Sequence, residues 1–223
     1  MSDMPDVSSE WKKQKPFPNA VIQDLFDLAV LKRAADEFPK ADDPRWQRFD
    51  NDKEKKLALR DTKDFPACHA LLNMLASQSF IDKVLKQITG IPNLIPNTLG
   101  GGLHMIVRDG FLKTHADFNY NEELQGYRRL NVLLFLNDGW HAGWGGQLEL
   151  TDENGLVYRK IDPIINRLVV FETSDKSFHG HPHPLRCSEY NARKSLALYF
   201  YTKEKPEGFT EAHSTIWLED IKK

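Results

Sequence analysis

Apolar residues in the first hundred positions recur mainly at helical spacing. After a short strand-like start near Val21, an apolar stripe with a period of about 3.6 residues covers 28–38, which predicts an amphipathic helix. Pro66 is suited to the first turn of a second helix, and a third helix is predicted over 80–88. The charged stretch 40–65 is predicted to be irregular apart from one short edge strand. The pattern therefore indicates a helical layer in the N-terminal part of the chain.

Beyond residue 98 the pattern changes to short β-type runs broken by Gly, Asn and Asp. Strands are predicted near 102–107, 111–117, 128–136, 146–151, 156–162, 167–172, 177–182 and 195–202. Short strands at this spacing are typical of two packed sheets. The predicted fold class is therefore mainly β with N-terminal helices and a double-stranded β-helix core of the jelly-roll or cupin-like type.

The same patterns predict one domain preceded by a tail. We expect a flexible tail over 1–15 and a single domain over 16–223. Within that domain, 16–98 would form a helical support layer, 99–203 the β-helix core and 204–223 a C-terminal extension.

Composition and charge narrow the function classes. The 223 residues are 40% hydrophobic and 28% charged, with a net charge of −2. These values are ordinary for a globular domain. The net charge gives no excess positive potential that would attract nucleic acid or an anionic membrane. Cys68 and Cys187 fit a reducing compartment better than a disulfide framework, although one bridge stays open. With no signal-peptide pattern and no run of ~20 apolar residues, we expect a cytoplasmic protein that acts on neither nucleic acid nor membranes.

The most informative chemical feature is the triplet His115-Ala-Asp117 at the end of a predicted strand. Residues two apart on a strand share a face, so both side chains can reach one ion. Such a short motif also arises by chance, but His179 follows in another predicted strand. Two imidazoles and one carboxylate are the ligand set of a facial-triad Fe(II) site. His181 and His183 compete with His179 for the third place, and we favour His179 because it follows the apolar register and precedes a Gly.

Arg193 extends this set beside the last predicted core strand. Its planar guanidinium can bind a carboxylate through two parallel hydrogen bonds, as a dicarboxylate cosubstrate such as 2-oxoglutarate would need. Strand alternation directs the adjacent Lys194 to the opposite face, where we predict a solvated side chain.

These motifs, in this order, resemble the prolyl 4-hydroxylase-type branch of the Fe(II)/2-oxoglutarate-dependent dioxygenases. The likeness extends over residues 100–203, close to half of the chain. The matching segments are 110–117 (GFLKTHAD), 129–137 (RLNVLLFLN), 145–150 (GGQLEL), 166–171 (NRLVVF), 177–180 (SFHG) and 193–196 (RKSL).

The resemblance implies both cofactors and chemistry. It implies that His115, Asp117 and His179 bind Fe(II) and that Arg193 forms a salt bridge to the distal carboxylate of 2-oxoglutarate. It also implies that O2 and 2-oxoglutarate are consumed, that succinate and CO2 are released and that a substrate C–H bond is hydroxylated. Ascorbate is a candidate reductant.

Two positions depart from the family pattern. Relatives often carry a cosubstrate-binding tyrosine on the first core strand, where this chain has His104, and a second tyrosine position holds Phe135. His104 either donates to a 2-oxoglutarate carboxylate or is a supporting or core histidine. Asn131 shares the strand face of Phe135 and is a candidate to line the same cosubstrate pocket.

The substrate is less determined by the sequence. Trp140, His141 and Trp144 in a Gly-rich loop either contact substrate or cap the core, and Arg128 with Arg129 either binds an acidic substrate or forms a solvated pair. We expect a prolyl residue of a peptide or protein, a free amino acid or another small molecule. The non-enzymatic alternative is a cupin-like metal- or small-molecule-binding protein without turnover. Halogenation is disfavoured because the carboxylate ligand is present, and zinc hydrolysis because no general-base Glu stands beside the metal histidines.

Overall fold

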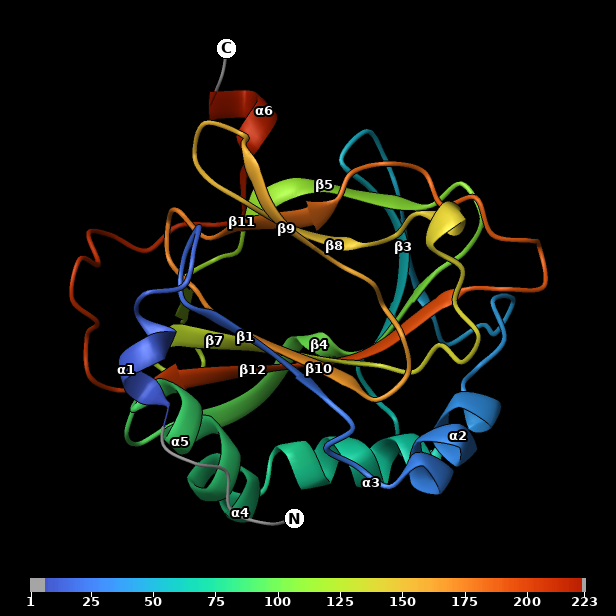
Figure 1. The fold of residues 1–223 in the computed structure, drawn as a ribbon, viewed down its shortest axis with the longest axis horizontal. Helices are drawn as coiled ribbons and strands as arrows, with labels where there is room; N and C mark the ends of the chain where they lie inside the picture. The colour runs from blue at the N-terminus through green and yellow to red at the C-terminus, as the bar shows by residue number, and fades with distance from the viewer. Residues whose placement is uncertain (1–6, 222–223) are drawn as a thin grey trace.

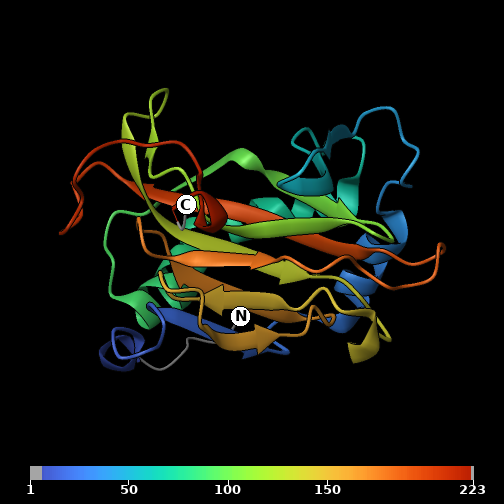
Figure 2. The ribbon, with the colours of Figure 1, turned by 90° about the horizontal axis from the view of Figure 1, so that it is seen from above.

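Two layers of strands and one layer of helices make up the structure, a computed structural model that describes residues 7–221. Helices α2 to α5 lie under the lower strand layer, and the upper strand layer covers its other face (Figure 1). Figure 2 shows the upper layer lying over the lower one. The helices are α1 (Ser8–Trp11), α2 (Leu28–Glu37), α3 (Pro66–Leu75), α4 (Gln78–Phe80), η1 (Ile81–Leu85), α5 (Lys86–Thr89), η2 (Ala142–Trp144) and α6 (Leu218–Ile221).

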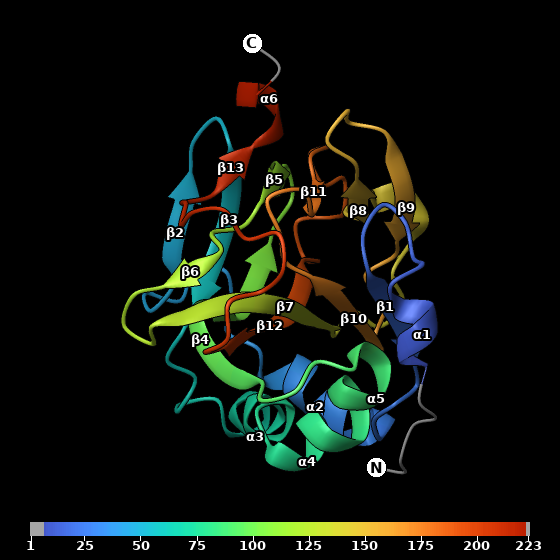
Figure 3. The ribbon, with the colours of Figure 1, turned by 90° about the vertical axis from the view of Figure 1, so that its left-hand side faces the viewer.

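All the strands belong to one sheet that folds over on itself. The lower layer contains β1 (Asn19–Gln23), β10 (Arg167–Glu172), β7 (Gly126–Phe135), β12 (Arg193–Thr202) and β4 (Ile95–Ile106) in spatial order. The upper layer contains β5 (Phe111–Ala116), β11 (Phe178–His181), β8 (Leu148–Thr151) and β9 (Val157–Ile161). Strand β3 (Glu54–Leu59) pairs with both β4 and β5 and so joins the layers along one side (Figure 3). Three short strands complete the sheet: β2 (Gln47–Asp50), β6 (Tyr120–Asn121) and β13 (Ile216–Trp217).

Strand β12 shows how alternation builds the two sides of the lower layer. It pairs with β4 on one side and β7 on the other, so it is a central strand. Leu196, Leu198 and Phe200 pack into the large core that the helices share. Tyr199 and Tyr201 point the other way, into the space between the strand layers. One strand therefore supplies both the hydrophobic core and the wall of the interior.

The predicted fold class is confirmed, and each of the predicted strands is present. Two differences concern the first half of the chain. Strand β4 begins at Ile95, earlier than expected, and β3 lies inside the stretch 40–65 that was predicted to be irregular. The sequence of β3, EKKLAL, buries only Leu57 and Leu59 fully, so its apolar signal is weak.

The predicted helices are also confirmed. The side chain of Asp27 accepts a hydrogen bond from the Ala29 amide and caps α2, and Pro66 opens α3. The third predicted helix spans α4, η1 and α5, with a π-helical middle, and ends at Gly90 in the left-handed conformation that glycine adopts readily.

The predicted tail differs from the structure after its first residues. Residues 1–6 lie outside the described part of the chain, but 8–11 form helix α1. Trp11 is only 3% exposed and belongs to the main hydrophobic core. A buried indole fixes this segment, so the expectation of a flexible tail is wrong for α1.

The C-terminal extension returns to the upper layer. Strand β13 pairs with β5, so that Trp217 stands opposite His115.

Cys68 and Cys187 are both buried and free, which excludes a bridge between them in this structure. Among the described helices, none is long and apolar enough to cross a membrane.

We expect Trp11→Ala to lower the free energy of unfolding by about 3–5 kcal/mol, because it removes a large buried side chain from the core. Val7→Ala is the control, since Val7 is exposed, and its effect should stay within ~0.5 kcal/mol. Urea unfolding would measure both. Equal effects of the two substitutions would contradict the packing of α1.

Candidate functional site

Three potential metal ligands meet between the two strand layers. His115 lies in β5, Asp117 follows that strand directly, and His179 lies in β11. The strands pair with His179 opposite His115, and the imidazole centroids are 4.5 Å apart. One ligand atom from each of the three residues lies within 4.8 Å of the others. Among the described residues, these three side chains form the one group of at least three His, Cys, Asp or Glu residues that could hold a metal ion.

Backbone hydrogen bonds orient both imidazoles. Nδ1 of His115 donates to the Lys113 carbonyl at 2.8 Å, and Nδ1 of His179 donates to the Ser177 carbonyl at 3.0 Å. In a neutral imidazole this hydrogen bond leaves the lone pair on Nε2. The Nε2 atoms face Asp117, 3.6 Å from Oδ1 for His115 and 3.4 Å from Oδ2 for His179. This is the tautomer that a metal ion needs, fixed by the hydrogen bond on the other nitrogen.

The protonation states also suit a metal ion. Burial, together with the neighbouring His115, lowers the pKa of His179 to about 4, so its imidazole is neutral at pH 7. Burial alone would raise the pKa of Asp117, but the nearby Arg128 and the two histidines outweigh it and hold that pKa well below its usual range. A neutral imidazole and an ionised carboxylate are donor forms that bind Fe(II).

Arg128 is buried directly behind Asp117. Its Nη2 atom donates to Oδ2 of Asp117 at 3.0 Å, and Nε and Nη2 both donate to Oδ1 of Asn131. The guanidinium carbon lies 3.6 Å from the ring centre of Tyr199 and 4.6 Å from that of Phe118. The solvated alternative for Arg128 is therefore wrong, because the side chain has no exposed surface.

Asn131 lines the interior cavity, as expected, but its amide is directed at the metal ligand. Its Nδ2 atom donates to Oδ2 of Asp117 at 2.6 Å, while its Oδ1 atom accepts from Arg128. The structure thus places Asn131 as a partner of Asp117, and its assignment to the cosubstrate stays a prediction.

Arg193 lies on the wall of the same cavity, whose volume is ≈70 Å³. It is 5% exposed, and its Nε atom donates to the Gly146 carbonyl at 2.8 Å. A side chain at Gly146 would collide with Leu185 and press on Arg193, so glycine permits this close approach. Burial lowers the pKa of Arg193 to about 9, and no carboxylate of the described residues forms an ion pair with it. A buried cation without an anion is costly, which makes the cavity suited to an anionic ligand.

His104 and Lys56 share this cavity wall. Burial, then the nearby Lys56, lowers the pKa of His104 to about 3. The neutral imidazole donates from Nε2 to the Gly100 carbonyl at 3.1 Å, which leaves Nδ1 as an acceptor. Donation to a carboxylate would require His104 to give up that bond. Lys56 was missed from the sequence because it lies on β3, the strand whose pattern was weak.

The remaining basic candidates occupy different places. His181 is buried on the cavity wall but is not part of the three-residue group, and His183 is exposed. The choice of His179 among the three is therefore confirmed. Lys194 does point to the opposite face, but it donates to the Ala35 carbonyl of α2 at 2.9 Å. Its predicted solvation is wrong because the helical layer covers that face.

The tryptophans of the Gly-rich loop pack at the Arg193 end of the cavity. Trp140 and Trp144 meet edge to face and pack against Ile106, Leu185 and Cys187. His141 packs against Trp144. These contacts support the alternative in which the loop caps the core.

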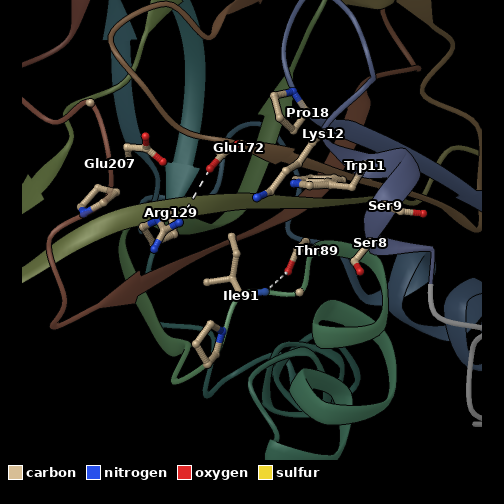
Figure 4. A pocket seen from close by; sticks show the side chains of 14 residues that line it. Ser8, Ser9, Trp11, Lys12, Pro18, Thr89, Ile91, Arg129, Glu172 and Glu207 are labelled. Carbon is tan, nitrogen blue, oxygen red and sulfur yellow. Dashed lines mark hydrogen bonds and ion pairs between the residues drawn. The ribbon is translucent and has the colours of Figure 1, made fainter.

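Arg129 faces away from the metal site and lines a larger cavity of ≈840 Å³ on the outside of the lower layer (Figure 4). There it lies 3.8 Å from Glu172, with Lys12 and Glu207 nearby. The described residues that line this outer cavity include no histidine, so it lacks the donor set of the triad.

Known proteins resemble this chain in both sequence and fold. Residues 101–201 match the 2OG-Fe(II) oxygenase superfamily. A curated relative, Prolyl 3-hydroxylase OGFOD1 of Mus musculus, is 37% identical over 93 residues, which are 40% of this chain but only 16% of that protein. A prolyl-4-hydroxylase of Pseudomonas putida has a similar fold, with a TM-score of 0.65, 17% identity and coverage of 90% of this chain and 100% of the other. A prolyl hydroxylase in complex with a hypoxia inducible factor peptide fragment, from Trichoplax adhaerens, has a TM-score of 0.64, 18% identity and coverage of 88% of each chain.

We expect acid to destabilise the metal-free protein partly through His104. The pKa of His104 is about 3 in the folded protein and 6.5 in an ordinary environment. The unfolded chain therefore takes up the proton first, and the stability that neutral His104 contributes above about pH 6.5 is lost as the pH falls toward about 3.

To test this, the free energy of unfolding of wild type and of His104→Gln would be measured by urea unfolding at several values from about pH 7 to about pH 5. The free energy of unfolding should fall more steeply in wild type, by up to ~1.4 kcal/mol per pH unit. Parallel pH curves would contradict the lowered pKa of His104 in the folded protein.

Proposed function

We propose that this chain, which belongs to the 2OG-Fe(II) oxygenase superfamily, hydroxylates a C–H bond of its substrate and converts 2-oxoglutarate to succinate and CO2. The observation that carries the proposal is the position of Arg193. It is a buried cation that has no anionic partner among residues 7–221, and it lines the same cavity as the three metal ligands. A metal-binding module without turnover would leave this costly group unexplained.

The donor set fits Fe(II). His115, Asp117 and His179 would hold the ion and leave coordination positions open, which is the arrangement of non-haem Fe(II) oxygenases. The bound iron supplies the oxidising chemistry when 2-oxoglutarate and O2 are present. The protein's own share is to keep the imidazole of His179 neutral, to hold the carboxylate of Asp117 ionised and to hold all three side chains between the strand layers.

Arg193 is our candidate for the distal carboxylate of 2-oxoglutarate. Its Nε atom is already bonded to Gly146, and none of the described residues makes a hydrogen bond to its two Nη atoms. Guanidinium groups bind carboxylates through paired hydrogen bonds. Lys56 and His104 lie on the same wall, and the ammonium of Lys56 forms an ion pair with Glu54 at 2.8 Å.

A prolyl residue in a peptide or protein is the substrate that we test first. Two similarities support this choice. The mouse relative is a prolyl 3-hydroxylase, and the prolyl hydroxylase of Trichoplax adhaerens is in complex with a peptide fragment. Free proline and other amino acids are the second group. The assay would incubate the protein with Fe(II), 2-oxoglutarate, ascorbate and each candidate, and follow succinate and a product heavier by one oxygen atom. Absence of turnover together with absence of 2-oxoglutarate binding would favour the cupin-like alternative.

We expect Arg193→Ala to weaken 2-oxoglutarate binding by at least ~30-fold, because it removes the buried cation that pairs with the ligand. Lys194→Met is the matched control, since its side chain lies on the helix-covered face, and it should leave the affinity unchanged. The measurement is an anaerobic titration with Fe(II) that follows the charge-transfer absorption band. Wild-type affinity in Arg193→Ala would refute the assignment of Arg193.

A further inference from the structure

A bulge in the lower layer turns Arg128 toward the metal site. In the pairing of β7 with β12, Leu130 is opposite Phe200 and Arg128 is opposite Tyr201, so one additional residue of β7, Arg129, falls between the two pairs. Strict alternation from Asn131 would place Arg129 inside and Arg128 outside. The bulge reverses these two orientations, so that Arg128 points inward and Arg129 outward. For this reason Arg128 and Asn131, three positions apart on β7, both contact Asp117. Bulges commonly re-aim a side chain next to an active site.

Burial of the guanidinium of Arg128 in this inward position costs free energy, because a charged group is removed from water. Arg128 has no exposed side-chain surface, and its Nη1 atom has no hydrogen-bond partner among the described residues. A buried guanidinium needs compensation, which here comes from the Asp117 carboxylate, the Asn131 amide oxygen and the rings of Phe118 and Tyr199. Its hydrogen bonds thus converge on Asp117 and on the amide that also holds Asp117.

The two oxygens of Asp117 are therefore not equivalent. Oδ2 accepts from Nη2 of Arg128 at 3.0 Å and from Nδ2 of Asn131 at 2.6 Å. Two donors occupy the two lone-pair directions of a carboxylate oxygen. Oδ1 receives no hydrogen bond from Arg128 or Asn131 and lies 3.6 Å from Nε2 of His115. Oδ2 lies 3.4 Å from Nε2 of His179, so it faces the triad as well, but both of its lone-pair directions are taken by the two donors.

We propose that Arg128 is a positioning residue that, together with Asn131, holds Oδ2 of Asp117 and leaves Oδ1 to bind the metal. This inference rests on the proposed function, because it requires that the triad binds a metal ion. Arg128 does not touch the metal in this assignment. It acts by fixing the rotation of the carboxylate before the ion arrives, as residues behind metal ligands often do.

The test uses Co(II) as an oxygen-stable probe of the Fe(II) site, with metal-free full-length protein. Arg128→Met retains the shape of the chain without its hydrogen bonds, and we expect its Co(II) affinity to be about 10- to 100-fold weaker than that of wild type. The visible absorption spectrum of bound Co(II) should also change, because the carboxylate is free to rotate. Arg129→Gln is the matched control: it changes the neighbouring arginine on the outer face and should bind Co(II) as wild type does.

Arg128→Lys keeps the test informative if Arg128→Met does not fold. Lysine retains the buried charge, but a single ammonium cannot join Asp117 and Asn131 as the planar guanidinium does, so binding should still be weaker than in wild type. A folded variant, checked by circular dichroism, with wild-type Co(II) affinity and spectrum would overturn the proposal. Failure of wild type to bind Co(II) would overturn this inference and the metal centre together. Weaker binding in the variants without any 2-oxoglutarate turnover in wild type would uphold the positioning role and refute only the oxygenase function.

Discussion

The pairing of β5 with β11 is the constraint on which the metal centre depends. Directly opposite residues of an antiparallel pair project on the same face, so the register that sets His179 against His115 brings both imidazoles together. A slip by one residue would move one of them to the other face. Both strands are held from their outer sides as well, β11 by β8 and β5 by β13. The C-terminal extension is thus a brace of the metal site, with Trp217 packed against the ring of His115.

Few side chains between the two strand layers carry a charge, and they lie close to the paired histidines. The imidazoles of His179 and His104 are neutral because burial lowers their pKa values, and Asp117 is the carboxylate of the cavity wall. The cations of this region are Arg128, which pairs with Asp117, Lys56, which pairs with Glu54, and Arg193, which pairs with none of the described carboxylates. A divalent ion would increase the positive excess further. A ligand with two carboxylates balances both the ion and Arg193, which is why a small dicarboxylate fits this interior better than a neutral sugar.

Much of this arrangement could be predicted from residue patterns. The strands of the core have alternating or continuous apolar runs, so periodicity was sufficient to predict them. Motif order predicted the triad, while the choice of His179 over His181 and His183 also used the strand register and the family resemblance. Strand β3 was missed because its residues are mostly charged, and Lys56 on the cavity wall was missed with it. Lys194 was placed on the correct face but predicted to be solvated, since the sequence does not show that α2 covers that face.

Arg128 shows a different limit of sequence patterns. Alternation along β7 correctly places Asn131 and Phe135 on one face, yet it assigns the wrong arginine to that face, because a bulge leaves no periodic signal. Only the buried environment distinguishes Arg128, between two aromatic rings, from Arg129, which pairs with Glu172 outside.

The size of the interior determines where substrate selection must take place. The cavity of ≈70 Å³ beside the triad has room for a few waters or a small cosubstrate. Near Arg193, the side chains of Leu185 and Trp140 pack beside Gly146. A cavity of this volume is too small to enclose a peptide or a large metabolite. The segments that border the metal ligands are therefore where a substrate of that size would make its contacts, among them the C-terminal extension, whose Trp217 packs against His115.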